Sequence, residues 1–218
     1  MSFAIFLKRI REEKKINQTE MADLLDISRT AIKFIENGST KHPSKKVLHN
    51  LASFLNITEI DVMIQILFDE NLENFDENEL FVRHYLAYMY LEGWNIVDHP
   101  YVYPICNGYS IEFDGKIIKK RQPKNIVLVS SYKKELYRIT EVKNRMDALG
   151  FVGDLVSKLM QVIDSYRGVK LIFNAENQEE KIAFDCISEV QMSHKGFNVE
   201  VVLYDKNTGV IATLQLLQ

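Results

Sequence analysis

Glu141 and Lys143 are separated by a single residue at the end of the segment LYRITEVK, whose alternating pattern predicts a buried strand. Side chains at positions i and i+2 of a strand point to the same face of a sheet. A carboxylate and an ammonium group placed in this way could hold a divalent metal ion and steady a water molecule that attacks a phosphodiester. The same two residues could also form a simple ion pair on the face of a strand.

A second group of residues has the chemistry to bind DNA without cutting it. Arg29 and Lys33 fall on one face of a predicted helix, from which they could donate to guanine acceptors, and Thr30 could meet a thymine methyl or a phosphate. Gln18 opens the preceding predicted helix, where the amide and the helix dipole favour phosphate. The alternative for each residue is that it is simply a polar, solvent-exposed residue on a helix face without a role in DNA binding. The predicted DNA contacts are Gln18, Ser28, Arg29, Thr30, Lys33, Asn37, Lys41, His42 and Lys45.

Short helices must position these side chains. Apolar residues recur at helical spacing through residues 3–15, and Asn17 with Glu20 predicts a capping box at the start of the second helix. Ser28 predicts the cap of the third helix and Gly38 its end, so only about three residues separate these two helices. This is the helix-turn-helix arrangement, whose second helix enters the major groove. Two further helices follow, the last with Thr58 and Asp61 as a capping pair.

The stretch NQTEMADLLDISRTAIKFIENGSTKHPS is similar to the DNA-binding domain of the Cro/repressor (XRE) family, and the resemblance covers residues 3–57. The matching positions are Gln18, Ala22, Ile27, Ser28, Glu36, Asn37, Gly38 and Pro43. The loop STKHPS is longer than the usual link of the family. The resemblance implies binding to double-stranded DNA, and a homodimer is expected because such domains usually read two half-sites one helical turn apart.

Composition and charge limit the class of protein. The chain has 218 residues and a net charge of −3, but residues 59–79 contain eight acidic residues and no Lys or Arg. Residues 1–58 contain ten Lys and Arg against six Asp and Glu, and this excess of positive charge favours binding to the phosphate backbone of a nucleic acid. Two isolated cysteines, no signal peptide and no run of ~18 apolar residues predict a cytoplasmic protein that does not enter a membrane.

The remainder of the chain has the pattern of an α/β domain. A helix over residues 79–93 precedes a strand at 94–99, a hairpin over 109–121 turning at Asp114-Gly115, and strands at 125–130 and 136–142. Helices over 151–168 and 177–196 alternate with strands at 169–175 and 197–205, so the later strands are expected to be parallel. We therefore predict a helix-turn-helix domain at 1–68, an acidic linker at 69–79 and a mixed sheet flanked by helices at 80–218.

This order of elements, over about residues 78–205, resembles the restriction-endonuclease-like superfamily, also called PD-(D/E)xK, in its Mrr-like arrangement. The resemblance implies that Glu141 and Lys143 occupy the Glu-x-Lys positions and that Gln161 is a polar site residue. The position of the metal-binding Asp is occupied by Asn125, a neutral ligand, although Mg²⁺ is usually held by carboxylates. Asp114 is a possible substitute metal ligand beside Glu141, but its Asp-Gly context favours a turn.

These observations favour a sequence-specific transcriptional regulator. Its C-terminal domain would keep a nuclease-like fold without efficient catalysis and would serve dimerisation, sensing of a small-molecule or protein effector, or partner binding. No cofactor is expected in that case. The alternative is a Mg²⁺-dependent DNA endonuclease that is targeted by its helix-turn-helix domain.

Overall fold

The computed structural model describes residues 2–68, 75–105, 109–136, 141–162, 166–190 and 198–217. The chain divides into two compact units, residues 1–87 and residues 88–218. The two units are described separately below.

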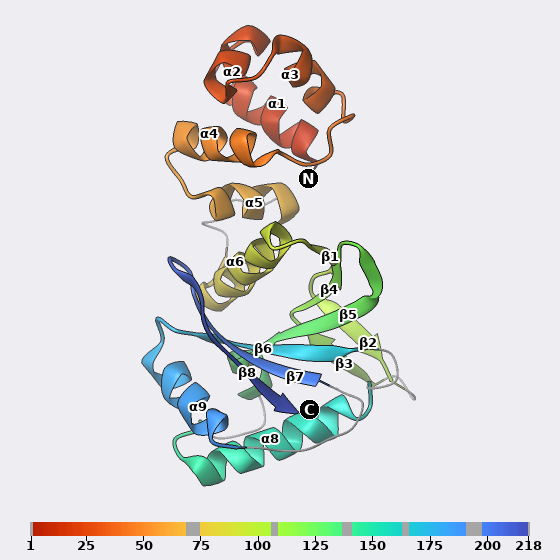
Figure 1. Ribbon diagram of the computed structural model, residues 1–218, viewed down its shortest axis with the longest axis vertical. Coiled ribbons are helices and arrows are strands. Elements are labelled where there is room, and N and C mark those ends of the chain that lie inside the picture. Colours follow the sequence, from red (N-terminus) through yellow and green to blue (C-terminus); the bar gives the residue numbers. More distant parts are fainter. Residues whose placement is uncertain are drawn as a thin grey trace. The chain divides into compact units, whose positions relative to one another are not determined.

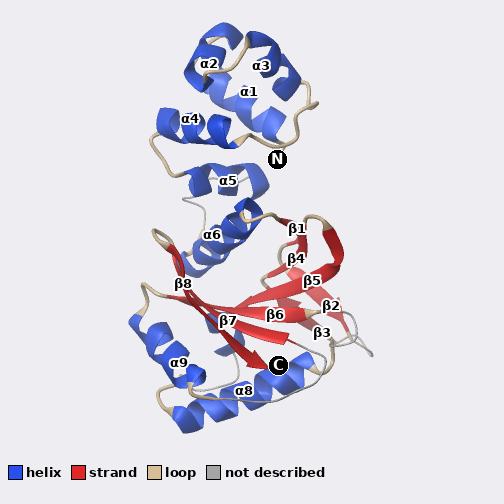
Figure 2. Ribbon diagram, viewed as in Figure 1, coloured by secondary structure: helices blue, strands red, loops and turns tan. Residues whose placement is uncertain are grey.

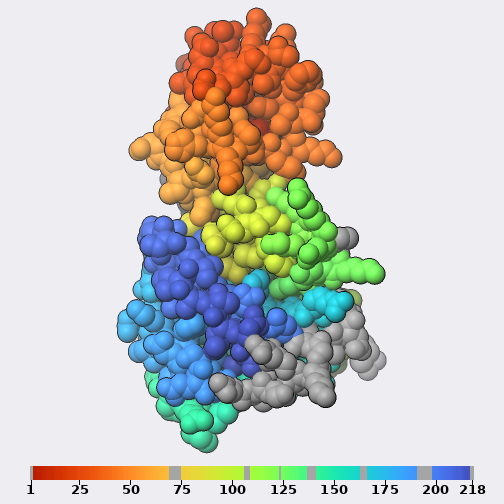
Figure 3. Space-filling view, viewed as in Figure 1, coloured from red at the N-terminus to blue at the C-terminus, as the bar shows by residue number. Residues whose placement is uncertain are grey.

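The N-terminal unit consists of short helices around one apolar core (Figure 1). Its helices are α1 (Phe3–Glu13), α2 (Gln18–Leu25), α3 (Arg29–Glu36), α4 (Lys45–Leu55), α5 (Glu59–Phe68) and the first part of α6 (Glu77–Leu91). Fully buried side chains from successive helices meet in the core, among them Leu7, Met21, Leu25, Ile32 and Leu51. Figure 3 shows the red and orange side chains of α1, α2 and α3 packed into one continuous mass.

The predicted helix ends of this unit are confirmed. The side chain of Asn17 accepts hydrogen bonds from the backbone amides of Thr19 and Glu20. The carboxylate of Glu20 accepts one from the backbone amide of Asn17, which completes the capping box. At α5, Asp61 accepts hydrogen bonds from the amide and hydroxyl of Thr58. The first backbone N–H groups of a helix have no acceptor within the helix. Such caps supply that acceptor, so they fix where each helix begins.

The C-terminal unit is built around a mixed sheet with helices on its face (Figure 2). The six strands lie in the order β1 (Trp94–Asp98), β4 (Gly115–Lys119), β5 (Gln122–Ser131), β6 (Gly168–Asn174), β7 (Asn198–Asp205) and β8 (Gly209–Leu217). Strand β6 is parallel to both β5 and β7, and the other neighbours are antiparallel. Strands β2 (Tyr101–Pro104) and β3 (Ser110–Phe113) form a separate pair.

Three helices accompany these strands. They are α7 (Tyr132–Glu135), α8 (Arg145–Leu159) and α9 (Gln178–Ser188). Buried residues of α8 and α9, such as Phe151 and Ala183, pack with Val169, Leu171 and Phe173 of β6 in one apolar cluster. The prediction of a mixed sheet with parallel later strands and flanking helices is therefore confirmed.

The predicted hairpin turn in this unit is wrong. Asp114 and Gly115 do not form a hairpin turn, because β3 pairs with β2 while β4 pairs with β1 and β5. The hairpin turn lies instead after Lys119, which is paired with Gln122. For the predicted strand at 136–142, the described residues 136, 141 and 142 are not in a strand.

Residues 137–140 of that predicted strand lie outside the described residues, and residues 141–143 have no regular secondary structure. The segment that follows β5 forms the short helix α7. The predicted linker at 69–79 also falls partly outside the described residues, which leave out 69–74.

Candidate nucleic-acid interface

A tight turn joins α2 to α3. Asp26 ends α2 in the left-handed conformation, with φ of 51°, and the amide of Ile27 bonds to the carbonyl of Ala22 at 3.0 Å. The side chain of Ser28 then accepts the amide of Ala31 at 3.1 Å and caps α3. Three residues thus reverse the chain between two helices, which is the geometry of a helix-turn-helix.

The two sides of α3 differ in character. Ile32 and Ile35 are buried against the rest of the unit, whereas Arg29 is exposed at the first turn. The opposite side consists of four exposed residues at i, i+3, i+4 and i+7 spacing, which places them on one face of the helix. These residues are Thr30, Lys33, Phe34 and Asn37. The predicted contacts Arg29, Thr30 and Lys33 are thus brought together on the surface, beside a Phe that sequence reasoning did not select.

The inner side of α3 is anchored by a polar network. Glu36 accepts hydrogen bonds from the Nε of Arg11 at 2.7 Å and from the side-chain amide of Gln18 at 2.8 Å. Arg11 also donates to the carbonyl of Ile16 at 3.3 Å. The network links α1, α2 and α3 and therefore fixes the position of α3.

The ionisation of Glu36 reflects this environment. Burial would raise its pKa, but hydrogen bonds from Arg11 and Gln18 and the positive charge of Arg11 outweigh burial and hold the pKa below its ordinary value. The hydrogen bond to Glu36 in turn raises the pKa of Arg11, against the opposing effect of burial. The pair is therefore charged in the folded protein near neutral pH.

Gln18 donates one N–H of its side-chain amide to Glu36. The amide group has a second N–H, so this N–H and the backbone N–H at the helix start are the groups that could bind a phosphate. The Oδ1 of Asn37 accepts the amide of Ser39 at 3.0 Å, and the side-chain NH2 group of Asn37 is a separate donor. Lys41, His42 and Lys45 are exposed around the loop that leads into α4.

The predicted catalytic residues are distributed over separate elements. Glu141 bonds to Lys143 at 2.8 Å in a segment without regular structure, and the two side chains are 47% and 72% exposed. The hydrogen bond and charge of Glu141 raise the pKa of Lys143. Asn125 lies on β5, and Gln161 follows the end of α8 and is exposed. The proposed strand that would have carried Glu141 and Lys143 toward a common metal site is absent at 141–143.

Asp114 is a buried structural carboxylate between β3 and β4. It accepts the backbone amide of Ser131 at 2.5 Å and lies 3.3 Å from the ammonium group of Lys134. Lys134 also bonds to Glu112 at 2.8 Å. Burial lowers the pKa of Lys134, but the charges of Asp114 and Glu112 and its hydrogen bonds to them raise it by more, so the net pKa is raised.

A second ion pair, which sequence reasoning missed, lies in the same part of the unit. The carboxylate of Glu135 contacts Lys158 at 2.7 Å and 2.8 Å and accepts the hydroxyl of Ser130. The pair joins residues 23 positions apart, and no spacing signal in the sequence could have indicated it. Within the described residues, no three His, Cys, Asp or Glu side chains form a group that could hold a metal ion.

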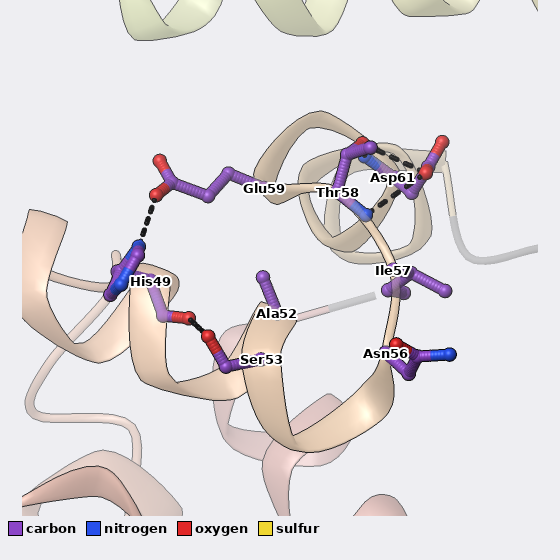
Figure 4. Close-up of a pocket in the computed structure, with 8 residues that line it drawn as sticks. All are labelled: His49, Ala52, Ser53, Asn56, Ile57, Thr58, Glu59 and Asp61. Carbon is purple, nitrogen blue, oxygen red and sulfur yellow. Dashed lines mark hydrogen bonds and ion pairs between the residues drawn. The ribbon is translucent and has the colours of Figure 1, made fainter.

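An open hollow of about 570 Å³ lies between α4 and α5 (Figure 4). His49 bonds to Glu59 at 3.0 Å across its mouth, and Thr58 bonds to Asp61 at 2.8 Å. Several of the polar side chains that line the hollow are thus paired with one another.

Among the described residues, no single helix is long and apolar enough to cross a membrane. Helices α4 and α5 together reach the required length and composition, but they are bent by 99° at the break between them.

Comparison with known proteins supports the first part of the sequence interpretation. Neither a curated protein nor a solved structure matches the chain. Residues 7–62 match the helix-turn-helix family model. The N-terminal segment is therefore similar to XRE-type helix-turn-helix domains, and this similarity indicates a DNA-binding regulator.

Proposed function

We propose that the protein is a dimeric, sequence-specific transcriptional regulator that inserts α3 into the major groove of double-stranded DNA. The observation that carries this proposal is the exposed face of α3, which presents Thr30 and Lys33 while Glu36 anchors the opposite side. A rigidly held helix with outward donors is what reading of base edges requires.

The proposal assigns a role to each of these exposed groups. Arg29 and Lys33 donate to guanine, because both can reach the O6 and N7 acceptors of the major groove. Thr30 meets a thymine methyl or a phosphate. The backbone amide at the start of α2, together with Lys41, His42 and Lys45, binds phosphates and sets the register on the duplex.

The sharpest test of this function uses Arg29→Ala. We expect it to weaken binding to a duplex selected from a random library by 5- to 150-fold, the equivalent of ~1–3 kcal/mol for a bidentate base contact. Binding to unselected DNA should fall much less. Both affinities can be measured by fluorescence anisotropy at one fixed salt concentration.

Lys181→Ala is the matched control, because it removes one exposed positive charge from α9 in the C-terminal unit. It should leave both affinities unchanged. Equal losses on selected and unselected DNA in Arg29→Ala would show that Arg29 contacts phosphate and not a base.

The C-terminal unit serves dimerisation, sensing or partner binding in this proposal, on a nuclease-like frame. The order α6, β1, β4, β5, α8 and β6, with β5 and β6 parallel, supports this part of the proposal. The resemblance to the restriction-endonuclease-like superfamily also assumed a strand with Glu141 and Lys143 between β5 and α8, and the described residues 141–143 are not in one.

The endonuclease alternative predicts a different outcome with metal. We expect the purified protein to bind its selected duplex and to leave it intact in Mg²⁺ or Mn²⁺, because Asp114 and Glu141 are each committed to a separate lysine. Gel analysis of an end-labelled duplex tests this directly. Metal-dependent cleavage that disappears in Glu141→Ala would favour the nuclease, and cleavage that appears only in Asn125→Asp would indicate a decayed site.

A further inference from the structure

Phe34 is an aromatic side chain on the exposed side of α3. It is 53% exposed although a Phe side chain is among the residues that gain most from burial. The core of the unit cannot take it, because Ile32 and Ile35 occupy the inner side of the same helix. Phe34 therefore lies among the exposed residues in the middle of the proposed reading face.

Its neighbours show what kind of surface Phe34 belongs to. Thr30 lies one turn before it, Asn37 lies three residues after it, and Lys33 is adjacent on the same side. Phe34 therefore forms an apolar patch bordered by hydrogen-bond donors and a positive charge. This combination suits a ligand that offers acceptors and one apolar group at close range, which is the major-groove edge of DNA.

We propose that Phe34 forms a binding subsite for the C5-methyl group of a thymine; this subsite rests on the proposed DNA-reading function of α3. Among the four bases only thymine presents a methyl group in the major groove, and apolar side chains are the groups that contact it. The other base that this face of α3 would contact is a guanine, which accepts hydrogen bonds from Arg29 or Lys33.

The helix geometry places the two bases close together. Arg29 and Phe34 are five residues apart, about 7.5 Å along an α-helix, and successive base pairs are separated by about 3.4 Å. The thymine should therefore lie roughly two base steps from a guanine that is read by Arg29. A selected half-site would contain this G and T at that fixed separation.

The test uses the full-length protein and a duplex enriched from a random library by the native protein. Each thymine is replaced singly by deoxyuridine, which removes the methyl group and leaves every hydrogen-bonding atom in place. We expect native protein to lose about fourfold in affinity at one thymine per half-site, the change that corresponds to ~0.8 kcal/mol for one buried methylene-sized group. Phe34→Ala should bind the thymine duplex more weakly and should show no further loss at that uracil.

Matched variants separate the subsite from a general effect on folding. Phe34→Leu keeps an apolar side chain and should retain sensitivity to the methyl group, whereas Phe34→Gln should lose it. Ile5→Ala changes another exposed apolar residue, on α1, and should keep the full native response. Thermal unfolding of each variant should match the native protein, since Phe34 is largely outside the core.

Two results would overturn the inference. One is a native protein that is insensitive to every thymine-to-uracil change, and the other is a Phe34→Ala variant that keeps the native sensitivity. In either case, loss of selective binding in Arg29→Ala would still support the proposed function, so failure of the subsite and failure of DNA reading are distinguishable.

Discussion

Glu36→Ala is expected to lower the free energy of unfolding of the N-terminal unit by about 3 kcal/mol or more. Glu36 and Arg11 are only 9% and 17% exposed, so removing the carboxylate leaves the guanidinium group partly buried without its counter-ion. The amide of Gln18 loses its acceptor at the same time. Equilibrium denaturation followed by circular dichroism measures the loss.

Glu13→Ala is the matched control. Glu13 pairs with Arg9 at 3.9 Å on the surface of α1, and exposed pairs of this kind contribute only about 0–1 kcal/mol. Glu36→Gln keeps the size of the side chain and one acceptor, so it should fall between the native protein and Glu36→Ala. Equal stabilities of the two alanine variants would show that the Glu36 network does not anchor α3.

The same network predicts how the stability depends on pH. The pKa of Glu36 is lower in the folded protein than in the unfolded chain, where a glutamate titrates near ~4.3. Its contribution is therefore fully present above that pH and is lost as the pH falls through the lower, folded value. The loss of stability in acid should be smaller in Glu36→Gln, which has no proton to gain at this position.

Gly168→Ala is expected to destabilise the C-terminal unit by about 1–3 kcal/mol, and by more if the strands separate. Gly168 pairs with Asn198 across the parallel strands β6 and β7. A Cβ atom at Gly168 would overlap the backbone carbonyl oxygen of Asn198 and would lie 3.2 Å from its Cβ. Because the obstacle is backbone, no rotation of a side chain can relieve it.

Gly150→Ala makes the opposite prediction in the same unit. Gly150 lies inside α8, and an added Cβ would meet nothing within 4 Å. Alanine at this position should stabilise the protein by about 0.5–1 kcal/mol, because it reduces the backbone conformational entropy of the unfolded chain. Thermal melts of both variants measure the contrast, and a Gly168→Ala variant as stable as Gly150→Ala would contradict the register of β6 and β7.

The sequence was sufficient to predict the N-terminal unit because its determinants are local. The capping box of Asn17 and Glu20 and the pair of Thr58 and Asp61 each lie within four consecutive residues. The inner face of α3 follows from helical periodicity, which also identifies Ile32 and Ile35 as core. Even so, the apolar residues Ile27 and Ala31 are only partly buried.

The C-terminal unit was harder to predict because distant residues decide its local structure. The signal at Asp114 and Gly115 is typical of a turn, but the amide of Ser131 and the ammonium group of Lys134 bind Asp114 and fix a buried corner. Neither partner can be identified from the residues next to Asp114.

The segment with Glu141 shows the same competition. Its apolar alternation predicts a strand, yet the amide of Val142 donates to the hydroxyl of Tyr132 at 3.0 Å instead of to a neighbouring strand. Asn144 then caps α8, so the segment serves as the entry to a helix. The sequence contains the Glu-x-Lys spacing, but the described residues 141–143 are not in a strand that would give these side chains a common face.

The parallel position of β6 also affects the speed of folding. Each of its two pairings must wait for a connection that contains a helix, α8 before β6 and α9 before β7. Proteins with such non-local pairings fold slowly, whereas short neighbouring helices such as α1 to α4 assemble on much faster timescales. The helix-turn-helix is therefore formed while β6, buried along its whole length in the native sheet, is still exposed to solvent, so the period of greatest susceptibility to aggregation belongs to the second unit.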